Sequence, residues 1–177
     1  MNGPLVVIDT ETTGFPGQSW ACVIEIGAVA YDAKGRERAA FNSFIRPSVA
    51  LDDRAAGALA VSGIEPEVLA DAPTSEVVWA AFCAWSRCIS AGTPVVTAYN
   101  VPFDKRMVES LPGWGALPWD PERCVLKAAT KALGKCKLNV AAERLNVPVY
   151  APLHRALSDA RTAGAVHWAL QAQGAML

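Results

Sequence analysis

The segment PLVVIDTETTG, residues 4–14, places two carboxylates directly after an apolar run. Leu5–Ile8 are four consecutive apolar residues, a pattern typical of a buried strand. Because side chains alternate between the two faces of a strand, Asp9 and Glu11 share one face, about 7 Å apart. Two like charges beside an apolar strand cost free energy unless something neutralises them. The segment therefore predicts a buried strand whose end meets a neutralising group.

Length and composition favour one folded domain, residues 1–177. Hydrophobic residues make up 52% of the chain and charged residues 19%, which argues against disorder and allows a substantial core. No apolar run approaches the length of a membrane span, and the N-terminus lacks the basic start and small-residue cleavage site of a secretory signal. We therefore expect no membrane association and a cytoplasmic location.

The cysteines favour the same compartment. They are five in number and contain no CxxC pair, so neither a disulfide framework nor a zinc site is expected. A reducing cytosol fits this usage best.

Charge is unevenly divided along the chain. Residues 1–100 hold 6 Lys/Arg and 11 Asp/Glu, a balance of −5, whereas residues 101–177 hold 10 and 6, a balance of +4. Lys127, Lys131 and Lys135 recur at four-residue spacing, which aligns them on one face of a helix. A solvated helix face is the ordinary interpretation of such a row, and a ridge that contacts phosphates is the alternative.

The order of the expected elements is that of an α/β fold. After the first strand, residues 22–32 and 37–47 have strand patterns and complete a three-stranded antiparallel meander. Further strands are expected at 93–100 and, from a weaker pattern, at 122–126. Helical patterns alternate with them, at 51–72 in pieces, 75–89, from Val101 onward, around the lysine row, at 138–145 and at 155–171. We expect a mixed five-stranded sheet, a meander followed by parallel strands, with helices on both faces.

Two further aspartates and a histidine lie in the second half of the chain. Asp104, in the segment YNVPFDKR, falls in the first turn of an expected helix, where negative charge is favoured whatever the function. Asp159, in HRALSDARTAG, lies on a helix whose small residues allow close approach to a sheet, which brings Asp159 toward the interior. His154 lies five residues earlier, about 140° around an ideal helix, so we place it on the preceding loop that contains Pro152.

Together, these motifs resemble the DEDD exonucleases. D-x-E at the end of the first strand, N-x-x-F-D later and H-x-x-x-x-D on the last helix resemble the histidine-bearing (DEDDh, DnaQ-like) branch, which includes proofreading exonuclease subunits and RNase T. The resemblance extends from Val6 to about Val166. It implies a ribonuclease H-like fold, two divalent metal ions and removal of nucleotides in the 3′-to-5′ direction. The family's catalytic positions correspond to Asp9, Glu11, Asp104, His154 and Asp159.

The resemblance also implies a role for each of these side chains. The four acidic residues would form a cage of oxygen ligands suited to Mg²⁺ or Mn²⁺, with four negative charges matching two divalent ions. Two such ions stabilise both the attacking water and the leaving oxygen of a phosphodiester. His154 would take the proton from the water as general base, a role that suits imidazole near neutral pH.

Substrate contacts follow from the same resemblance. Thr12, Thr13 and Gly14 would border the terminal nucleotide, and Asn100 and Phe103 would belong to its pocket. The alternative for Thr12–Gly14 is an ordinary tight turn. The alternative for Phe103, and the better supported one, is a position in the core.

Two positions depart from the family pattern. Ser62 and Tyr99 stand where proofreading subunits often carry histidine. Neither belongs to the expected metal cage, so they bear on substrate preference and weaken an identification with replicative proofreading. His167 and the six tryptophans are expected mainly in packing roles, although tryptophan can also stack on bases.

We therefore expect a metal-dependent 3′–5′ exonuclease that releases nucleoside 5′-monophosphates from single-stranded or frayed DNA. The sequence leaves two alternatives open: the same reaction on short or structured RNA ends, and a non-catalytic nucleic-acid-binding or polymerase-associated module. The five intact catalytic-type residues favour an enzyme. Nucleic acid 3′ ends are the expected partners, and polymerase association and a homodimer stay open.

Overall fold

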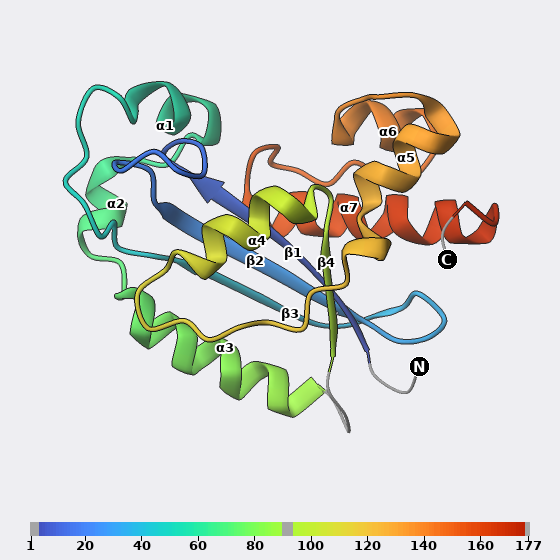
Figure 1. Ribbon diagram of the computed structural model, residues 1–177, viewed down its shortest axis with the longest axis horizontal. Helices are drawn as coiled ribbons and strands as arrows, with labels where there is room; N and C mark the ends of the chain where they lie inside the picture. Colours follow the sequence, from blue (N-terminus) through green and yellow to red (C-terminus); the bar gives the residue numbers. More distant parts are fainter. Residues whose placement is uncertain (1–3, 90–93, 176–177) are drawn as a thin grey trace.

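A four-stranded mixed sheet lies at the centre of the structure, a computed structural model that describes residues 4–89 and 94–175 (Figure 1). The strands occur in the spatial order β3-β2-β1-β4, with the first three antiparallel and β4 parallel to β1. Their bounds are Leu5–Thr12 for β1, Val23–Tyr31 for β2, Glu37–Phe44 for β3 and Val95–Ala98 for β4. The expected meander and the parallel strand after it are confirmed.

The fifth strand expected at residues 122–126 was wrong. Pro121–Arg123 form a 3-10 turn, η1, which is capped because the Asp120 side chain accepts a hydrogen bond from the Glu122 N–H. Proline has no N–H to donate to a sheet ladder, which disfavours a strand here. Among the residues that the structure describes, an isolated parallel bridge between Trp119 and Val96 is the one pairing at this edge of β4, so no fifth strand forms there.

Helices cover both faces of this sheet, and their positions agree with the sequence patterns. In Figure 1, α3 and α7 lie on opposite sides of the strands. No helix within residues 4–89 and 94–175 is long and apolar enough to cross a membrane. The α-helices are α1 Ala56–Ser62, α2 Pro66–Ala70, α3 Ser75–Ile89, α4 Val101–Glu109, α5 Val125–Leu133, α6 Leu138–Arg144 and α7 Ala156–Ala172.

The alternation of side chains along β1 assigns each residue to one of two layers. Val6 and Ile8 belong to the core cluster shared with α3 and α4. Leu5 and Val7 belong instead to the cluster shared with α7. Because the period is two, the odd-numbered residues that follow at the end of β1 point toward α7, and even-numbered Thr10 points toward α4.

Helix α7 approaches the sheet closely because two glycines remove side chains from the contact. A Cβ on Gly27 of β2 would overlap the backbone of Ala156 and Leu157, and a Cβ on Gly164 would overlap the ring of Tyr31. Any larger residue at either position would push the helix away from the strands. The close approach brings the first turn of α7 beside the end of β1.

Candidate active site

Three carboxylates converge where β1 ends. Asp9 and Glu11 lie on the α7 side of β1, and Asp159 lies in the first turn of α7. Each of the three offers a carboxylate oxygen, and these oxygens lie within 4.8 Å of one another. The structure therefore brings together side chains that are 150 positions apart in the chain.

Asp104 reaches the same end of β1 from the other face. It lies in the first turn of α4, is 3% exposed, and accepts a hydrogen bond of 2.9 Å at Oδ1 from the Thr10 hydroxyl. Thr10 lies between Asp9 and Glu11 and points to the opposite face of the strand. The end of β1 therefore contacts Asp159 of α7 on one face and Asp104 of α4 on the other. Asp104 is not part of the close group of three oxygens, but its charge raises the pKa of Asp9 more than any other neighbouring charge does.

Burial makes these carboxyl groups hard to ionise. Desolvation, followed by the charges of Asp104, Asp159 and Glu11, raises the pKa of Asp9 well above its usual value. Burial and then the charge of Asp159 raise the pKa of Glu11 to about 7, and burial raises that of Asp104 to about 7. A crowded set of oxygen donors whose negative charge is poorly solvated fits hard divalent cations such as Mg²⁺ and Mn²⁺.

His154 lies outside the carboxylate group but beside Asp159. It is exposed, lies on the loop before α7 as expected, and has a positive φ of 56°, which is uncommon for a residue with a Cβ. Burial raises the pKa of Asp159, whereas the imidazole and a backbone hydrogen bond from His154 oppose that rise. The backbone N–H of Tyr150 donates to the Thr162 hydroxyl at 3.1 Å, which fastens the loop to α7.

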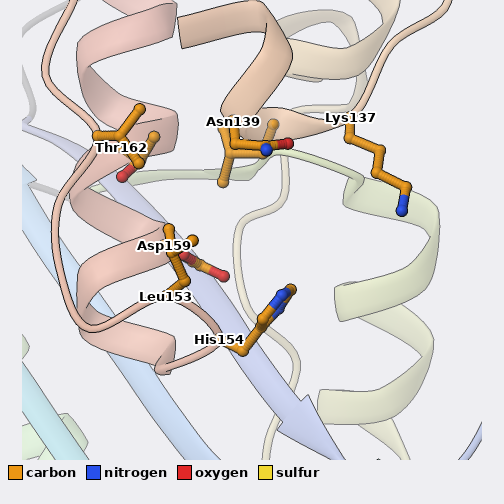
Figure 2. A pocket seen from close by; sticks show the side chains of 8 residues that line it. Lys137, Asn139, Leu153, His154, Asp159 and Thr162 are labelled. Carbon is orange, nitrogen blue, oxygen red and sulfur yellow. The ribbon is translucent and has the colours of Figure 1, made fainter. Parts of the chain in front are cut away.

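His154 and Asp159 border a cavity of about 170 Å³ between the loop and α6 (Figure 2). Lys137 and Asn139, at the start of α6, line its opposite side. Lys137 therefore lies close to the acidic site, whereas Lys127 and Lys131 lie exposed on α5. A cation beside this cavity suits a polyanionic ligand.

The residues expected to border a nucleotide have local structural partners. The Thr12 hydroxyl donates to the Gly14 carbonyl at 2.8 Å, and the buried Thr13 hydroxyl accepts from the Cys22 N–H at 2.9 Å. A Cβ on Gly14 would come within 2.6 Å of the Gln18 side chain, so the turn requires glycine for close approach. Thr12 ends β1, Thr13 and Gly14 form a bend, and the hydrogen-bonded turn follows at Phe15–Gln18. The contact of Thr12, Thr13 and Gly14 with a nucleotide stays a prediction.

Asn100 and Phe103 flank the start of α4. Asn100 is the N-cap residue, but its side chain makes no capping hydrogen bond. Phe103 is half-buried against the main core and meets the ring of Phe15 edge-on, with a centroid separation of 6.4 Å. Phe103 thus packs in the core as expected, and its contact with substrate also stays a prediction.

Ser62 and Tyr99, which depart from the family pattern, both make internal hydrogen bonds. The Ser62 hydroxyl donates to the Leu59 carbonyl within α1, and the Tyr99 hydroxyl donates to the Cys136 carbonyl at 2.8 Å. Neither residue belongs to the close carboxylate group.

Glu25 is a buried acid beside the site that sequence reasoning missed. It lies on β2 directly opposite Glu11 and is completely buried. Its charge contributes to the raised pKa of Asp9, Glu11 and Asp159. The signal in the sequence was a glutamate inside the apolar run VIEIG, on the strand face that the pairing with Glu11 directs toward α7.

Comparisons with known proteins point to one class of enzyme. The model of the RNase_T family, described as exonuclease, matches residues 6–167. Exonuclease X in complex with 5′ overhanging duplex DNA shares 24% identity at a TM-score of 0.74, covering 98% of this chain and 94% of that one. The nuclease domain of 3′hExo, a DEDDh family member bound to rAMP, shares 16% sequence identity at a TM-score of 0.78. That match covers 99% of this chain and 94% of the other.

Another structural match is longer than this chain. Cell-death related nuclease 4 (CRN-4) shares 16% identity at a TM-score of 0.76, and the match covers 98% of this chain but 65% of that one. No curated protein matches the chain.

Proposed function

The chain belongs to the RNase_T family of exonucleases, and from this premise we propose that residues 1–177 form one catalytic domain acting on single-stranded or frayed DNA. The chain is a 3′–5′ exonuclease, a hydrolase of phosphodiester bonds. The observation that carries the proposal is the group of three carboxylate oxygens within 4.8 Å of one another, next to buried Asp104 and exposed His154.

The four carboxylates are proposed to hold two divalent ions, Mg²⁺ or Mn²⁺. When bound, two such ions activate water and stabilise the leaving oxygen of the phosphodiester. Asp9, Glu11 and Asp159 supply the close oxygens, and Asp104 supplies charge from the α4 side while Thr10 holds its Oδ1. The raised pKa values of Asp9, Glu11 and Asp104 support this assignment, because positive charge would relieve the cost of ionising them.

His154 is proposed to act as the general base. Its imidazole lies on the exposed side of Asp159, where a ring nitrogen can accept the proton of the attacking water and later release it to solvent. The Tyr150–Thr162 hydrogen bond limits how far the loop can move from α7. A general base contributes typically 10²–10⁴-fold to the rate.

The terminal nucleotide is proposed to lie beside Thr12, Thr13 and Gly14, with Asn100 and Phe103 on its other side. The exposed Lys137 then faces the backbone of the strand across the cavity that it shares with His154. DNA is proposed as the preferred substrate because Exonuclease X, at 24% identity, is described with duplex DNA. The rAMP bound to 3′hExo makes RNA the competing substrate to test.

The test uses 5′-labelled single strands of DNA and RNA with the same sequence, incubated with Mg²⁺, Mn²⁺ or chelator. We expect DNA to shorten stepwise from the 3′ end in either metal, to release nucleoside 5′-monophosphates and to stay intact in chelator. Faster shortening of RNA would replace DNA by RNA as the substrate. A circular single strand is the control, because cuts within it would contradict the exonuclease assignment.

A further inference from the structure

Glu25 is held by four hydrogen bonds at the junction of β2, β3 and α7. Its Oε1 accepts from the Asn42 side chain at 3.0 Å and from Arg155 Nη2 at 2.9 Å. Its Oε2 accepts from Arg155 Nε at 3.0 Å and from the Ala156 N–H at 3.2 Å. Each carboxylate oxygen thus receives two donors, and the side chain is completely buried.

The partners of Glu25 lie where the histidine loop becomes α7. Arg155 directly follows His154, and its guanidinium also lies over the ring of Phe44, 5.1 Å from the centroid. Ala156 is the first residue of α7, and no side chain at the N-cap position satisfies the start of this helix. Glu25 supplies the missing acceptor from a strand about 130 positions away.

This anchor lies within one helical turn of two proposed active-site residues. Asp159 follows Ala156 by three positions, about one turn of helix, and His154 precedes it by two. Any rotation or shift of the start of α7 would therefore move both side chains relative to the carboxylates of β1. Misplacement by about 1 Å can cost about 10²-fold in rate.

Stability alone does not account for a charged pair at this place. The carboxylate of this pair is buried and its guanidinium is half-buried. Ion pairs, whether exposed or buried, add little net stability, and a well-packed apolar contact often serves the fold equally well. Glu25 also adds negative charge beside Asp9 and Glu11, which already repel each other. The pair instead fixes the orientation of Arg155, and with it the start of α7, relative to β2. A guanidinium that donates two parallel hydrogen bonds to a carboxylate is held in one relative orientation.

We propose that Glu25 and Arg155 are positioning residues that orient the start of α7, so that Asp159 and His154 meet the carboxylates of β1 in the geometry required for turnover. This inference rests on the proposed function of those residues. Neither Glu25 nor Arg155 belongs to the close group of three carboxylate oxygens.

The chain contains a matched control on the same helix. Arg161 of α7 donates through Nε and Nη2 to Glu37 of β3, at distances of 2.8–3.3 Å. Glu37 is exposed, and the pair lies outside the carboxylate group. Arg155→Lys and Arg161→Lys therefore remove the same paired geometry while keeping the charge, one beside the site and one away from it.

The experiment measures kcat and KM on labelled DNA, Mn²⁺ affinity by calorimetry, and Tm in chelator. Changes in residues that support metal ligands typically cost 10–100-fold in activity or metal affinity. We expect Arg155→Lys to lose about that much in kcat or in Mn²⁺ affinity, with KM for DNA nearly unchanged and Tm close to that of Arg161→Lys. Arg161→Lys should keep kcat and Mn²⁺ affinity within about twofold of the parent. Glu25→Gln against Glu37→Gln repeats the comparison from the other partner.

The positioning role is overturned if both lysine variants lose activity equally, or if Arg155→Lys matches the parent in kcat and Mn²⁺ affinity. It is also overturned if the loss in Arg155→Lys is accounted for by unfolding at the assay temperature. Failure of the proposed function looks different, because the parent itself would then shorten neither DNA nor RNA. The Mn²⁺ affinities of the two lysine variants would still decide whether the pair orients Asp159.

Discussion

Two histidines lie toward opposite ends of α7, His154 on the loop before the helix and His167 in its C-terminal half, and their surroundings differ. At the N-terminal end, His154 is exposed and lies beside Asp159, and Arg155 is paired with Glu25. Toward the C-terminal end, His167 is 1% exposed and packs edge-on against Trp168, with a centroid separation of 5.2 Å. Among the described residues, neither ring nitrogen of His167 has a hydrogen-bond partner.

The difference shows that a perturbed ionisable group is not by itself a functional site. Burial, helped by the charge of Arg123, lowers the pKa of His167 to about 4, so this histidine is neutral and serves as packing. Burial also raises the pKa of Asp9, but there four acidic neighbours add to the effect. Only the second case concentrates charge that a cation can relieve, and such clusters occur at functional sites.

The largest expected contrast between the two ends is in turnover. His154→Ala should lower kcat by roughly 10²–10⁴-fold, the usual cost of losing a general base. His167→Leu should leave kcat within about twofold, because His167 lies away from the carboxylate group. The measurement is the rate of 3′ shortening of labelled DNA by both variants at saturating Mn²⁺. Equal rates for His154→Ala and the parent across pH 6 to 9 would remove His154 from the mechanism.

A smaller effect is expected on the stability of the metal-free protein when Asp104 of the acidic site is replaced. Burial raises the folded-state pKa of Asp104 to about 7, so the folded protein holds a proton on Asp104 that the unfolded chain has already released. The free energy of unfolding therefore falls as pH rises from about 4 through 7. Asp104→Asn removes this dependence and keeps an oxygen that can accept from Thr10. In chelator at pH 8 the variant should be more stable than the parent by roughly 2–4 kcal/mol.

Thermal melts at pH 4 and pH 8, in chelator and in Mn²⁺, check this prediction. The advantage of Asp104→Asn should be near zero at pH 4, and Mn²⁺ should raise the Tm of the parent more than that of the variant. A variant that melts well below the parent in chelator at pH 8 would mean that Asp104 holds the fold through its hydrogen bonds. An equal Mn²⁺ shift in both proteins would remove Asp104 from the metal site.

The smallest expected effect is on stability and comes from His167, in the C-terminal half of α7. Its dependence on pH is opposite to that of Asp104, because stability falls as pH is lowered. The folded-state pKa of His167 is lowered to about 4, so its contribution to stability is present above about pH 6.5 and is lost as pH falls toward 4. Relative to His167→Leu, the parent should lose roughly 2 kcal/mol between pH 7.5 and pH 5. Urea unfolding at the two pH values measures it, and a constant difference between the two proteins would contradict a buried neutral histidine.

Local sequence patterns predicted most of the elements because their causes are local. Val78 and Phe82 of α3 are buried as the helical period required, and Gly63 ends α1 in the left-handed conformation. The expected strand at 122–126 failed because Pro121 begins a capped turn just before it, and α5 starts at Val125. Short apolar runs of this kind do not distinguish a strand from the start of a helix.

The sequence by itself determined which chemistry-bearing residues the chain contains and the order of the elements that carry them. The spacing of Asp9 and Glu11 already required one shared strand face, and that is how β1 presents them. The placement of His154 on a loop before the last helix followed from the same kind of local geometry and was confirmed. These inferences needed only the periods of strand and helix.

Tertiary structure alone decided how residues far apart in the chain meet. The register of β2 against β1 sets Glu25 opposite Glu11, and the missing side chain of Gly27 lets α7 come close enough for the Glu25–Arg155 pair to form. The same packing places Asp159 beside Asp9 and Glu11. On the other face of β1, Asp104 is held by the hydrogen bond from Thr10. No local pattern encodes these contacts, because they depend on the distance and angle between elements that side-chain packing sets only in the assembled fold.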